Sequence, residues 1–420
     1  MEKITLYDFQ KKILEKSKGD CQVAYYLDMG LGKTFVGSEK LKELGKTINL
    51  LVCQKSKIAD WVEHFKAYYD YKIYNLSNKK EYASFCEYNI KKKTIAIINY
   101  DLVFRRNLSS LFELCDYTLM LDESSLIQNL GAKRTQYILW KLKPHNVILL
   151  SGTPVGGKYE NLYSQLYLLG YKEKYKTFFS RFIRTKTLHL KNGRVQEIPY
   201  GYKNEKELKE LMLYYNCYFL KTDEVIDLPS QNFINVNLPK PEGYDELKAK
   251  PLNDTEHAAF VRLIKLRQMC GLSKEKAESF EDLITSSQSR FIVFYCYNEE
   301  LEIIKSICKK NNKPLSFING AVKDLENYEE QENSITLIQY QAGAMGLNLQ
   351  KANKIIFYSP TFRSELYEQA KKRIHRIGQK SHCFYYLLKC GFDYAVYNIL
   401  EKREDYTNKL FIKEFNYEKK

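Results

Sequence analysis

QVAYYLDMGLGKT, residues 22–34, is an apolar run followed by a glycine-containing turn and then by a lysine and a threonine. The apolar run predicts a buried β-strand, and the helical pattern after it predicts a strand–loop–helix unit. A glycine-containing loop in this place lets successive backbone N–H groups face a phosphate chain, and the helix N-terminus adds a favourable dipole. The stretch therefore predicts a phosphate-binding loop.

Two side chains in this loop have the chemistry to hold a nucleotide. Lys33 would reach the β- and γ-phosphates, and the Thr34 hydroxyl would help to hold Mg²⁺. Leu27 stands where the pattern G-x-x-x-x-G-K-[ST] has its first glycine, so the alternative interpretation is a glycine turn with a solvated lysine. The other candidate nucleotide-binding residues of the loop are Gly30, Leu31 and Gly32.

Apolar runs of strand length recur in both halves of the chain and alternate with helical stretches. In the N-terminal part they are QVAYYL (22–27), TINLLVC (47–53), TIAIIN (94–99), YTLML (117–121) and NVILLS (146–151). In the C-terminal part they are FIVFYCY (291–297), PLSFI (314–318), ITLIQY (335–340), KIIFYS (354–359) and CFYYLL (383–388). Nearly continuous apolar strands are typical of parallel sheets that are buried on both faces. We therefore expect two α/β domains.

The middle of the chain has a different pattern. Residues 166–250 are rich in Lys, Tyr and Glu, and they contain the helical pattern NEKELKELMLYY (204–215). We expect a largely helical insertion here rather than another sheet. The predicted boundaries are therefore 1–165 for an N-terminal lobe with the phosphate loop, 166–250 for a helical protrusion or bridge, and 251–420 for a C-terminal lobe.

The composition is that of a globular chain with a basic balance. The 420 residues include 66 Lys and Arg against 51 Asp and Glu, and the net charge of +15 favours polyanionic partners such as nucleic acid or an anionic membrane surface. No apolar run approaches the roughly 18 residues of a membrane span, and the N-terminus lacks the apolar core of a secretory signal. Ten scattered cysteines without a C-x-x-C pair argue against structural zinc and for a reducing compartment. We expect a cytoplasmic protein without a membrane partner.

Two carboxylates, Asp122 and Glu123, end the apolar run at residues 117–121. An apolar strand that ends in two acids is costly unless they face a polar site. Asp122 would complete the Mg²⁺ shell, and Glu123 would orient and activate a water for attack on the γ-phosphoryl group. The alternative is a strand end at which two acids meet solvent.

The motifs resemble, in order along almost the whole chain, those of Swi/Snf-type ATPases of helicase superfamily 2. DMGLGKT (28–34) is similar to motif I, D-E-M-G-L-G-K-T, and Asp122-Glu123 is similar to motif II. The other matching segments are LYDFQ (6–10), with Gln10 as the adenine-reading glutamine, SGTP (151–154), LRQMC (266–270), QAGAMGLNL (341–349) and QAKKRIHRIGQ (369–379). The resemblance implies two RecA-like parallel-sheet lobes with a helical insertion between them. It also implies a DNA-dependent ATPase that uses ATP and Mg²⁺.

The last of these segments carries two arginines, Arg373 and Arg376. Because they are three residues apart, they would project from one face of a helix. Two guanidinium groups on one face suit the oxygens of a transferring phosphoryl group, so we expect arginine fingers. The alternatives are a basic helix that binds nucleic acid backbone and a solvated face. The resemblance also places Gly346 among the nucleotide-binding residues.

Two features depart from the family pattern. Motif II reads DESS (122–125) where the family has D-E-A-H or D-E-G-H, so the carboxylates are kept and the histidine is lost. The segment from about residue 320 to 334 is short and lacks the large insertion of many chromatin remodellers. These features imply a minimal motor of the phage or bacterial kind, located in the cytoplasm of a bacterium or of an infected host.

The resemblance implies double-stranded DNA as the partner, contacted mainly through its phosphates. The expected DNA-contacting or coupling residues are Lys55, Ser56, Asn99, Tyr100, Ser151, Thr153 and Gln341. Residues 91–93, three lysines, are either part of this track or a solvated turn, and residues 218–229 are either a DNA-guiding lever or a structural brace. The expected function is ATP-driven translocation along double-stranded DNA, or remodelling of protein–DNA or branched DNA. The alternatives are a helicase that separates strands of forked or single-stranded DNA and a DNA-binding scaffold regulated by nucleotide.

Overall fold

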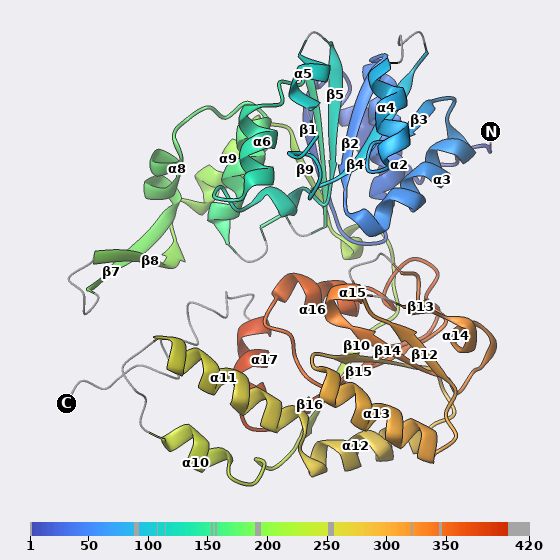
Figure 1. Ribbon diagram of the computed structural model, residues 1–420, viewed down its shortest axis with the longest axis vertical. Helices are drawn as coiled ribbons and strands as arrows, with labels where there is room; N and C mark the ends of the chain where they lie inside the picture. Colours follow the sequence, from blue (N-terminus) through green and yellow to red (C-terminus); the bar gives the residue numbers. More distant parts are fainter. Residues whose placement is uncertain are drawn as a thin grey trace. The chain divides into compact units, whose positions relative to one another are not determined.

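The computed structural model of the chain describes residues 2–87, 92–106, 108–113, 115–152, 154–155, 158–189, 195–250, 256–320, 322–343 and 347–401. The chain divides into two compact units, Met1–Ile226 and Asp227–Lys420 (Figure 1). Each unit has its own β-sheet and its own hydrophobic core. Within the described ranges, no helix combines the length and the apolar character needed to cross a lipid bilayer.

The first unit is built on a sheet of seven parallel strands. The strands are β1 (Gln22–Leu27), β2 (Ile48–Cys53), β3 (Lys72–Asn75), β4 (Thr94–Asn99), β5 (Tyr117–Asp122), β6 (Asn146–Ser151) and β9 (Cys217–Leu220). Their order across the sheet is β3-β4-β2-β5-β6-β1-β9, and every neighbouring pair is parallel. All five strands predicted in this part of the chain are present. They are confirmed because each is an apolar run buried on both faces.

Helices connect the strands of the first unit. The α-helices are α1 (Asp8–Lys16), α2 (Lys33–Leu44), α3 (Ile58–Tyr68), α4 (Lys79–Glu87), α5 (Leu108–Phe112), α6 (Lys133–Trp140), α7 (Tyr163–Leu168), α8 (Tyr175–Phe182) and α9 (Glu205–Tyr214). The 3-10 helices are η1 (Lys55–Lys57), η2 (Ser124–Ile127), η3 (Tyr159–Leu162) and η4 (Thr222–Glu224). Parallel strands require such crossover connections, so the carboxyl ends of the strands gather at one edge of the sheet.

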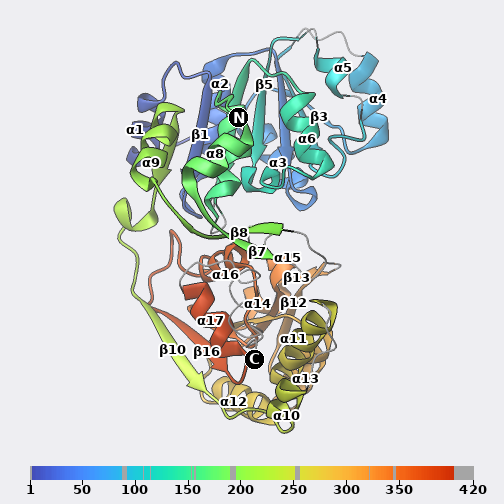
Figure 2. The same cartoon turned by 90° about the vertical axis from the view of Figure 1, so that its left-hand side faces the viewer.

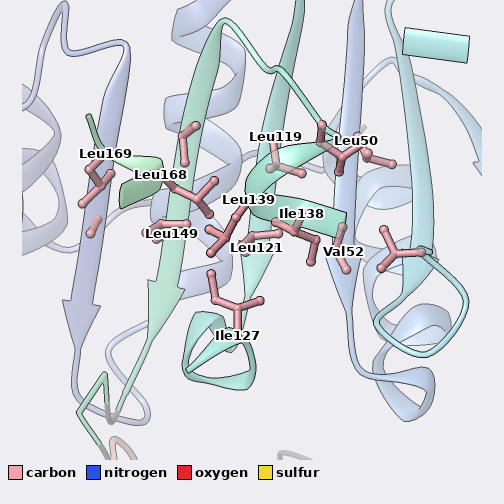
Figure 3. Packing of buried hydrophobic residues seen from close by; sticks show 14 of the residues in the cluster. Leu50, Val52, Leu119, Leu121, Ile127, Ile138, Leu139, Leu149, Leu168 and Leu169 are labelled. Atoms are coloured by element: carbon pink, nitrogen blue, oxygen red, sulfur yellow. The ribbon is translucent and has the colours of Figure 1, made fainter. Parts of the chain in front are cut away.

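Successive side chains of each strand enter different cores. Leu119 and Leu121 of β5 pack with Leu50 and Leu149 in one cluster, which Figure 3 shows. Met120, between them in the sequence, packs in a second cluster on the other face of the sheet. All of these side chains are fully buried. Both faces of the sheet are covered by apolar side chains, and burying a polar group there without a partner would cost free energy. Polar residues are therefore placed at the carboxyl edge of the sheet.

The second unit repeats this plan with a mostly parallel sheet. Its strands are β10 (Gln231–Asn237), β11 (Phe291–Tyr295), β12 (Leu315–Ile318), β13 (Lys323–Asp324), β14 (Ile335–Gln339), β15 (Lys354–Phe357) and β16 (Cys383–Lys389). Their order is β10-β16-β15-β11-β14-β12-β13, and only the pairing of β12 with β13 is antiparallel among the described pairs. The helices are α10 (Tyr244–Ala249), α11 (Glu256–Gly271), α12 (Lys274–Thr285), α13 (Asn298–Lys310), α14 (Glu326–Glu330), α15 (Tyr340–Gly343), α16 (Ser364–Lys371) and α17 (Asp393–Glu401).

The middle of the chain contains more strand than its composition predicted. Besides α8, α9 and α10, residues 166–250 contain an antiparallel hairpin of β7 (Ile183–His189) and β8 (Val195–Tyr202). β9 extends the first sheet beside β1 (Figure 1), and β10 extends the second sheet beside β16 (Figure 2). The expectation of a largely helical segment is therefore wrong for these four strands. Each lies at a sheet edge or in the hairpin, where one face or edge meets solvent and a continuous apolar run is not needed.

Candidate nucleotide site

The predicted phosphate loop lies between β1 and α2. Gly32 precedes the helix with φ of 71° and ψ of 39°, in the left-handed region that favours glycine. A Cβ atom at this position would lie 2.3 Å from Nε2 of Gln10. Position 32 therefore requires glycine for its backbone conformation and for space.

Gln10 of α1 holds the loop through its amide group. Its Nε2 donates to the carbonyl oxygen of Leu31 at 2.9 Å, and its Oε1 accepts from the backbone N–H of Tyr7 at 3.0 Å. The Gln10 and Leu31 side chains are buried. Both ends of the amide thus bind backbone, and reading of adenine by Gln10 stays a prediction.

Lys33, the first residue of α2, lies against the start of its own loop. Its Nζ donates to the carbonyl oxygen of Leu27 at 3.1 Å. The same Nζ lies 3.2 Å from the place that a Cβ atom on Gly152 would occupy. Gly152 follows β6, so the lysine, the end of β1 and the turn after β6 meet at one point. The turn after β6 is part of the segment that resembled motif III.

Asp122, at the end of β5, is held by two aromatic side chains. Nε1 of Trp61, on α3, donates to its Oδ2 at 2.9 Å, and the hydroxyl of Tyr100 donates to its backbone carbonyl at 2.9 Å. Burial raises the pKa of the Asp122 carboxyl, whereas the Trp61 hydrogen bond and the positive charge of Lys33 act to lower this pKa. The positive charge of Lys33 thus acts on the Asp122 carboxylate, and the expected roles of the two residues toward phosphate and Mg²⁺ stay predictions.

Glu123 has a strained backbone. Its φ of 54° and ψ of 58° place a non-glycine residue in the left-handed region, which costs about 1–2 kcal/mol. Such a conformation persists only where the surroundings hold it, and strained residues of this kind cluster at functional sites. The residue immediately after it, Ser124, is buried and begins η2.

The donor set at this edge of the sheet suits a hard divalent cation. The Thr34 hydroxyl and the Asp122 carboxylate are oxygen ligands of the type that Mg²⁺ prefers. Elsewhere in the described part of the chain, the potential ligand atoms of Cys270, Cys390 and Asp393 lie within 4.8 Å of one another. There the ammonium of Lys276 already donates to Asp393 at 2.6 Å, so a resident cation neutralises the carboxylate.

We expected Arg373 and Arg376 to project from one face of a helix, and this expectation is wrong. α16 ends at Lys371, and Arg373 and Arg376 follow in turns. Arg373 is buried, and Nη1 of Arg376 donates to the carbonyl oxygen of Leu347 at 3.2 Å. Burial lowers the pKa of the Arg376 guanidinium.

The amide of Gln379 ties the segment after α16 to the loop before β15. Nε2 of Gln379 donates to the carbonyl oxygens of Gln350, Ala352 and Ile374. Gly378 beside it has φ of 95°, which a helix does not allow. The segment therefore folds back onto the loop before β15 instead of extending α16.

The expected DNA-contacting residues are split by burial. Lys55 and Ser56 on η1 and Gln341 on α15 are exposed. Asn99 and Tyr100 are buried, with their side chains bonded to Ser77 and to the Asp122 carbonyl. As buried side chains these two residues present little surface to DNA, and coupling, the other role expected of them, stays a prediction.

Ser151, at the end of β6, is buried. Thr153 and Gly346 lie outside the described residues.

Two site residues have no signal in the sequence motifs. Trp61 lies on α3, and its indole nitrogen could not be placed against Asp122 without the tertiary structure. Thr222, after β9, donates from its backbone N–H and its hydroxyl to Oδ2 of Asp28 at 3.1 and 3.2 Å. These bonds tie the first residue of the loop to the edge strand of the sheet.

Comparisons with known proteins agree with the motifs. The SNF2-related domain matches residues 26–290, and the helicase conserved C-terminal domain matches residues 275–378. A Mycoplasma pneumoniae protein described as an ATP-dependent helicase is 22% identical over 93% of this chain and 40% of its own length. A Bacillus subtilis protein described as an ATP-dependent helicase/translocase is 24% identical over 84% of this chain and 42% of its own length.

A solved structure aligns over most of the chain. It is the Sulfolobus solfataricus SWI2/SNF2 ATPase core in complex with double-stranded DNA, with 20% identity, a TM-score of 0.48, and coverage of 99% of this chain and 94% of that one. The chain spans about two fifths of the length of the two bacterial relatives. The SNF2-related domain alone matches more than half of the residues, and the chain therefore belongs to the SNF2-related family of helicase superfamily 2.

Proposed function

We propose that the protein hydrolyses ATP and uses the free energy to move along double-stranded DNA. The proposal is carried by one observation: Lys33 contacts the end of β1 and Gly152 at the edge of the sheet where Asp122 ends β5. Ligands of open parallel sheets bind at this carboxyl edge. Membership of the SNF2-related family supports a nucleotide as the ligand.

The residues of the first unit have distinct roles in this proposal. Lys33 exchanges the Leu27 carbonyl for phosphate oxygens and neutralises their charge. Thr34 and Asp122 would hold Mg²⁺, which when bound would neutralise phosphate charge. Glu123 orients the attacking water and accepts its proton. Trp61 and Tyr100 keep Asp122 in place through the two hydrogen bonds at its side chain and carbonyl.

The second unit supplies cationic side chains. Arg376, whose guanidinium donates to the backbone carbonyl of Leu347 at 3.2 Å, is the stronger arginine-finger candidate. Its partial burial makes a phosphate partner favourable, since a charged group in an apolar setting gains most from an opposite charge. Arg373 is buried and is the second arginine-finger candidate.

The net charge of +15 and the exposed residues Lys55, Ser56 and Gln341 support a nucleic acid partner. Contacts from lysine, serine and glutamine side chains to phosphates carry no base information, as a protein that moves along DNA requires. Double-stranded DNA is proposed as the track. Branched and protein-bound DNA are further substrates of the same motion.

The test compares ATP turnover on blunt duplex, forked, branched and single-stranded DNA of equal length. We expect blunt duplex to stimulate turnover, and a third strand bound to the duplex to be displaced in an ATP-dependent manner. Stimulation by single strands alone, with separation of a forked duplex, would instead establish a strand-separating helicase. DNA binding that nucleotide alters without turnover would establish a regulated scaffold.

Lys33→Ala is the matched control for each of these assays. It should abolish turnover and strand displacement on every DNA. Turnover that is unaffected by this change would remove the phosphate loop from the proposal.

A further inference from the structure

The residue directly after Asp122 and Glu123, Ser124, has a buried hydroxyl group. Ser124, the first residue of η2, is fully buried, and its Oγ donates to Oε1 of Gln165 at 2.7 Å. Gln165, on α7, is also fully buried, and its Nε2 donates to the carbonyl oxygen of Pro154 at 2.8 Å. One amide thus connects the residue after Glu123 with the turn that follows β6.

A second amide makes a parallel connection. Nδ2 of Asn161, on η3, donates to Oε1 of Gln128 at 2.9 Å and to the carbonyl oxygen of Val155 at 2.8 Å. Asn161 and Gln165 are four residues apart on consecutive helical turns, so they lie on the same face. They bind adjacent carbonyl groups, those of Pro154 and Val155. The turn after β6 is therefore held to η2 by two side chains.

The same turn contacts the phosphate loop at its other end. Gly152 lies against Nζ of Lys33 and Cγ of Met29, each 3.2 Å from the place of its missing Cβ. A shift of this turn would press on the lysine on one side and pull on Gln165 on the other. This turn thus contacts Lys33 at Gly152, and at Pro154 it is bonded to Gln165 and through Gln165 to Ser124.

Ser124 lies beside a strained residue. Glu123 has left-handed backbone angles, and such a conformation needs its neighbours to be anchored. The buried bond of Ser124 supplies an anchor one residue away. Loss of the bond between Ser124 and Gln165 would leave each of these buried groups with one hydrogen-bond partner fewer. The backbone of Glu123 could then relax.

This connection depends on a departure from the family motif. Ser124 stands where motif II of the family has alanine or glycine, neither of which has a side-chain donor. A buried glutamine is costly without partners, and Gln165 has one for each end of its amide. The two polar residues therefore belong together as a pair.

We propose that Gln165 is a positioning residue that sets the orientation of Glu123 according to the state of the phosphate loop and of the turn after β6. This inference rests on the proposed ATP hydrolysis and names a residue through which it is regulated. Gln165 touches neither nucleotide nor water in this assignment. Its effect appears in the rate of the chemical step and not in the affinity for ATP.

The experiment measures kcat and KM for ATP, with and without saturating duplex DNA, in four variants. They are Gln165→Met, Ser124→Ala, their double mutant and Asn49→Leu. Asn49 is the matched control because it is a fully buried amide in the same unit, bonded to the carbonyls of Lys46 and Thr94. The midpoint of thermal unfolding is recorded for each variant.

Gln165→Met and Ser124→Ala should each lower the DNA-stimulated kcat by about tenfold, because each breaks one positioning contact. The KM for ATP should stay within about twofold of that of the parent protein. The double mutant should be no slower than the slower single mutant, because both changes break one connection. Asn49→Leu should lower the unfolding midpoint and leave kcat within about twofold.

Several results would overturn the inference. They are an unchanged kcat in Gln165→Met and Ser124→Ala, a fall in kcat that Asn49→Leu shares, and additive losses in the double mutant. If Gln165→Met does not fold, Ser124→Ala alone decides, since it removes only one oxygen atom. A parent protein without ATP turnover would contradict the proposed function itself, whereas a DNA-stimulated parent with unaffected variants would contradict only the role of Gln165.

Discussion

The indole Nε1 of Trp61 donates a 2.9 Å hydrogen bond to Oδ2 of Asp122, so a helix that covers one face of the first sheet orients the carboxylate at the end of β5. The bond favours the ionised carboxylate, while burial raises the pKa of Asp122. The folded protein therefore binds a proton at this site more tightly than the unfolded chain does, whose carboxyl has the ordinary value of 3.8.

Asp122→Asn should raise the stability of the folded protein at neutral pH. Because the pKa is raised on folding, ionisation of Asp122 destabilises the folded state as the pH rises from 3.8 through the folded value. The amide removes this cost, so its gain in unfolding midpoint should be present at pH 7 and vanish below pH 3.8. Thermal unfolding across this pH range measures the difference. A gain that persists in acid would show that ionisation is not its source.

Gly32→Ala should destabilise the first unit and disturb the phosphate loop. The left-handed backbone costs an alanine about 1–2 kcal/mol, and its Cβ would lie 2.3 Å from Nε2 of Gln10. Denaturant unfolding measures the loss. Adding Gln10→Ala should recover the part that comes from the clash and leave the part that comes from the backbone. Equal losses with and without Gln10 would remove the contact from the explanation.

Glu123→Gln should leave ATP binding intact and slow turnover at least about a hundredfold, equivalent to about 3 kcal/mol of lost stabilisation of the transition state. The amide keeps the size of the side chain, so the strained turn before η2 is kept, but it cannot accept the proton of the attacking water. Nucleotide binding by fluorescence and turnover at saturating DNA separate the two effects. Turnover close to that of the parent would exclude Glu123 as the base.

Arg376→Ala should spare nucleotide binding and abolish hydrolysis. Its guanidinium donates to the Leu347 carbonyl, so its loss removes one backbone bond and the cationic group proposed to stabilise the transferring phosphoryl group. Arg376→Lys is the control that keeps the charge but not the planar fork. Equal losses of binding and hydrolysis would mark Arg376 as a binding residue instead.

Lys276→Met should strongly destabilise the second unit. Lys276 and Asp393 form a fully buried ion pair at 2.6 Å, and removing one partner leaves an uncompensated charge that costs about 3–5 kcal/mol. Adding Asp393→Leu should restore much of the loss, because neither charge is then buried. The unfolding midpoint of the two variants measures this. A double mutant as unstable as the single one would point to packing rather than charge.

The parts of the fold that local sequence predicts well are the central strands and the phosphate loop. QVAYYL and NVILLS became β1 and β6 with the predicted limits, because an apolar run buried on both faces needs no information from elsewhere in the chain. The hairpin β7–β8 and the edge strands β9 and β10 were missed, since their exposed sides are polar or short.

The sequence alone thus indicated the family, through its ordered motifs, and the two parallel-sheet units, through their apolar runs. It also named candidate residues for phosphate and Mg²⁺, since residue type and spacing are local properties. Only the tertiary structure decided which polar atoms are partners. It bonded Tyr100 to the backbone carbonyl of Asp122, ended α16 before Arg373, and joined Ser124 to Gln165. The physical reason is that a hydrogen bond depends on where two elements pack, and residues 41 positions apart in the chain carry no local sign of that meeting.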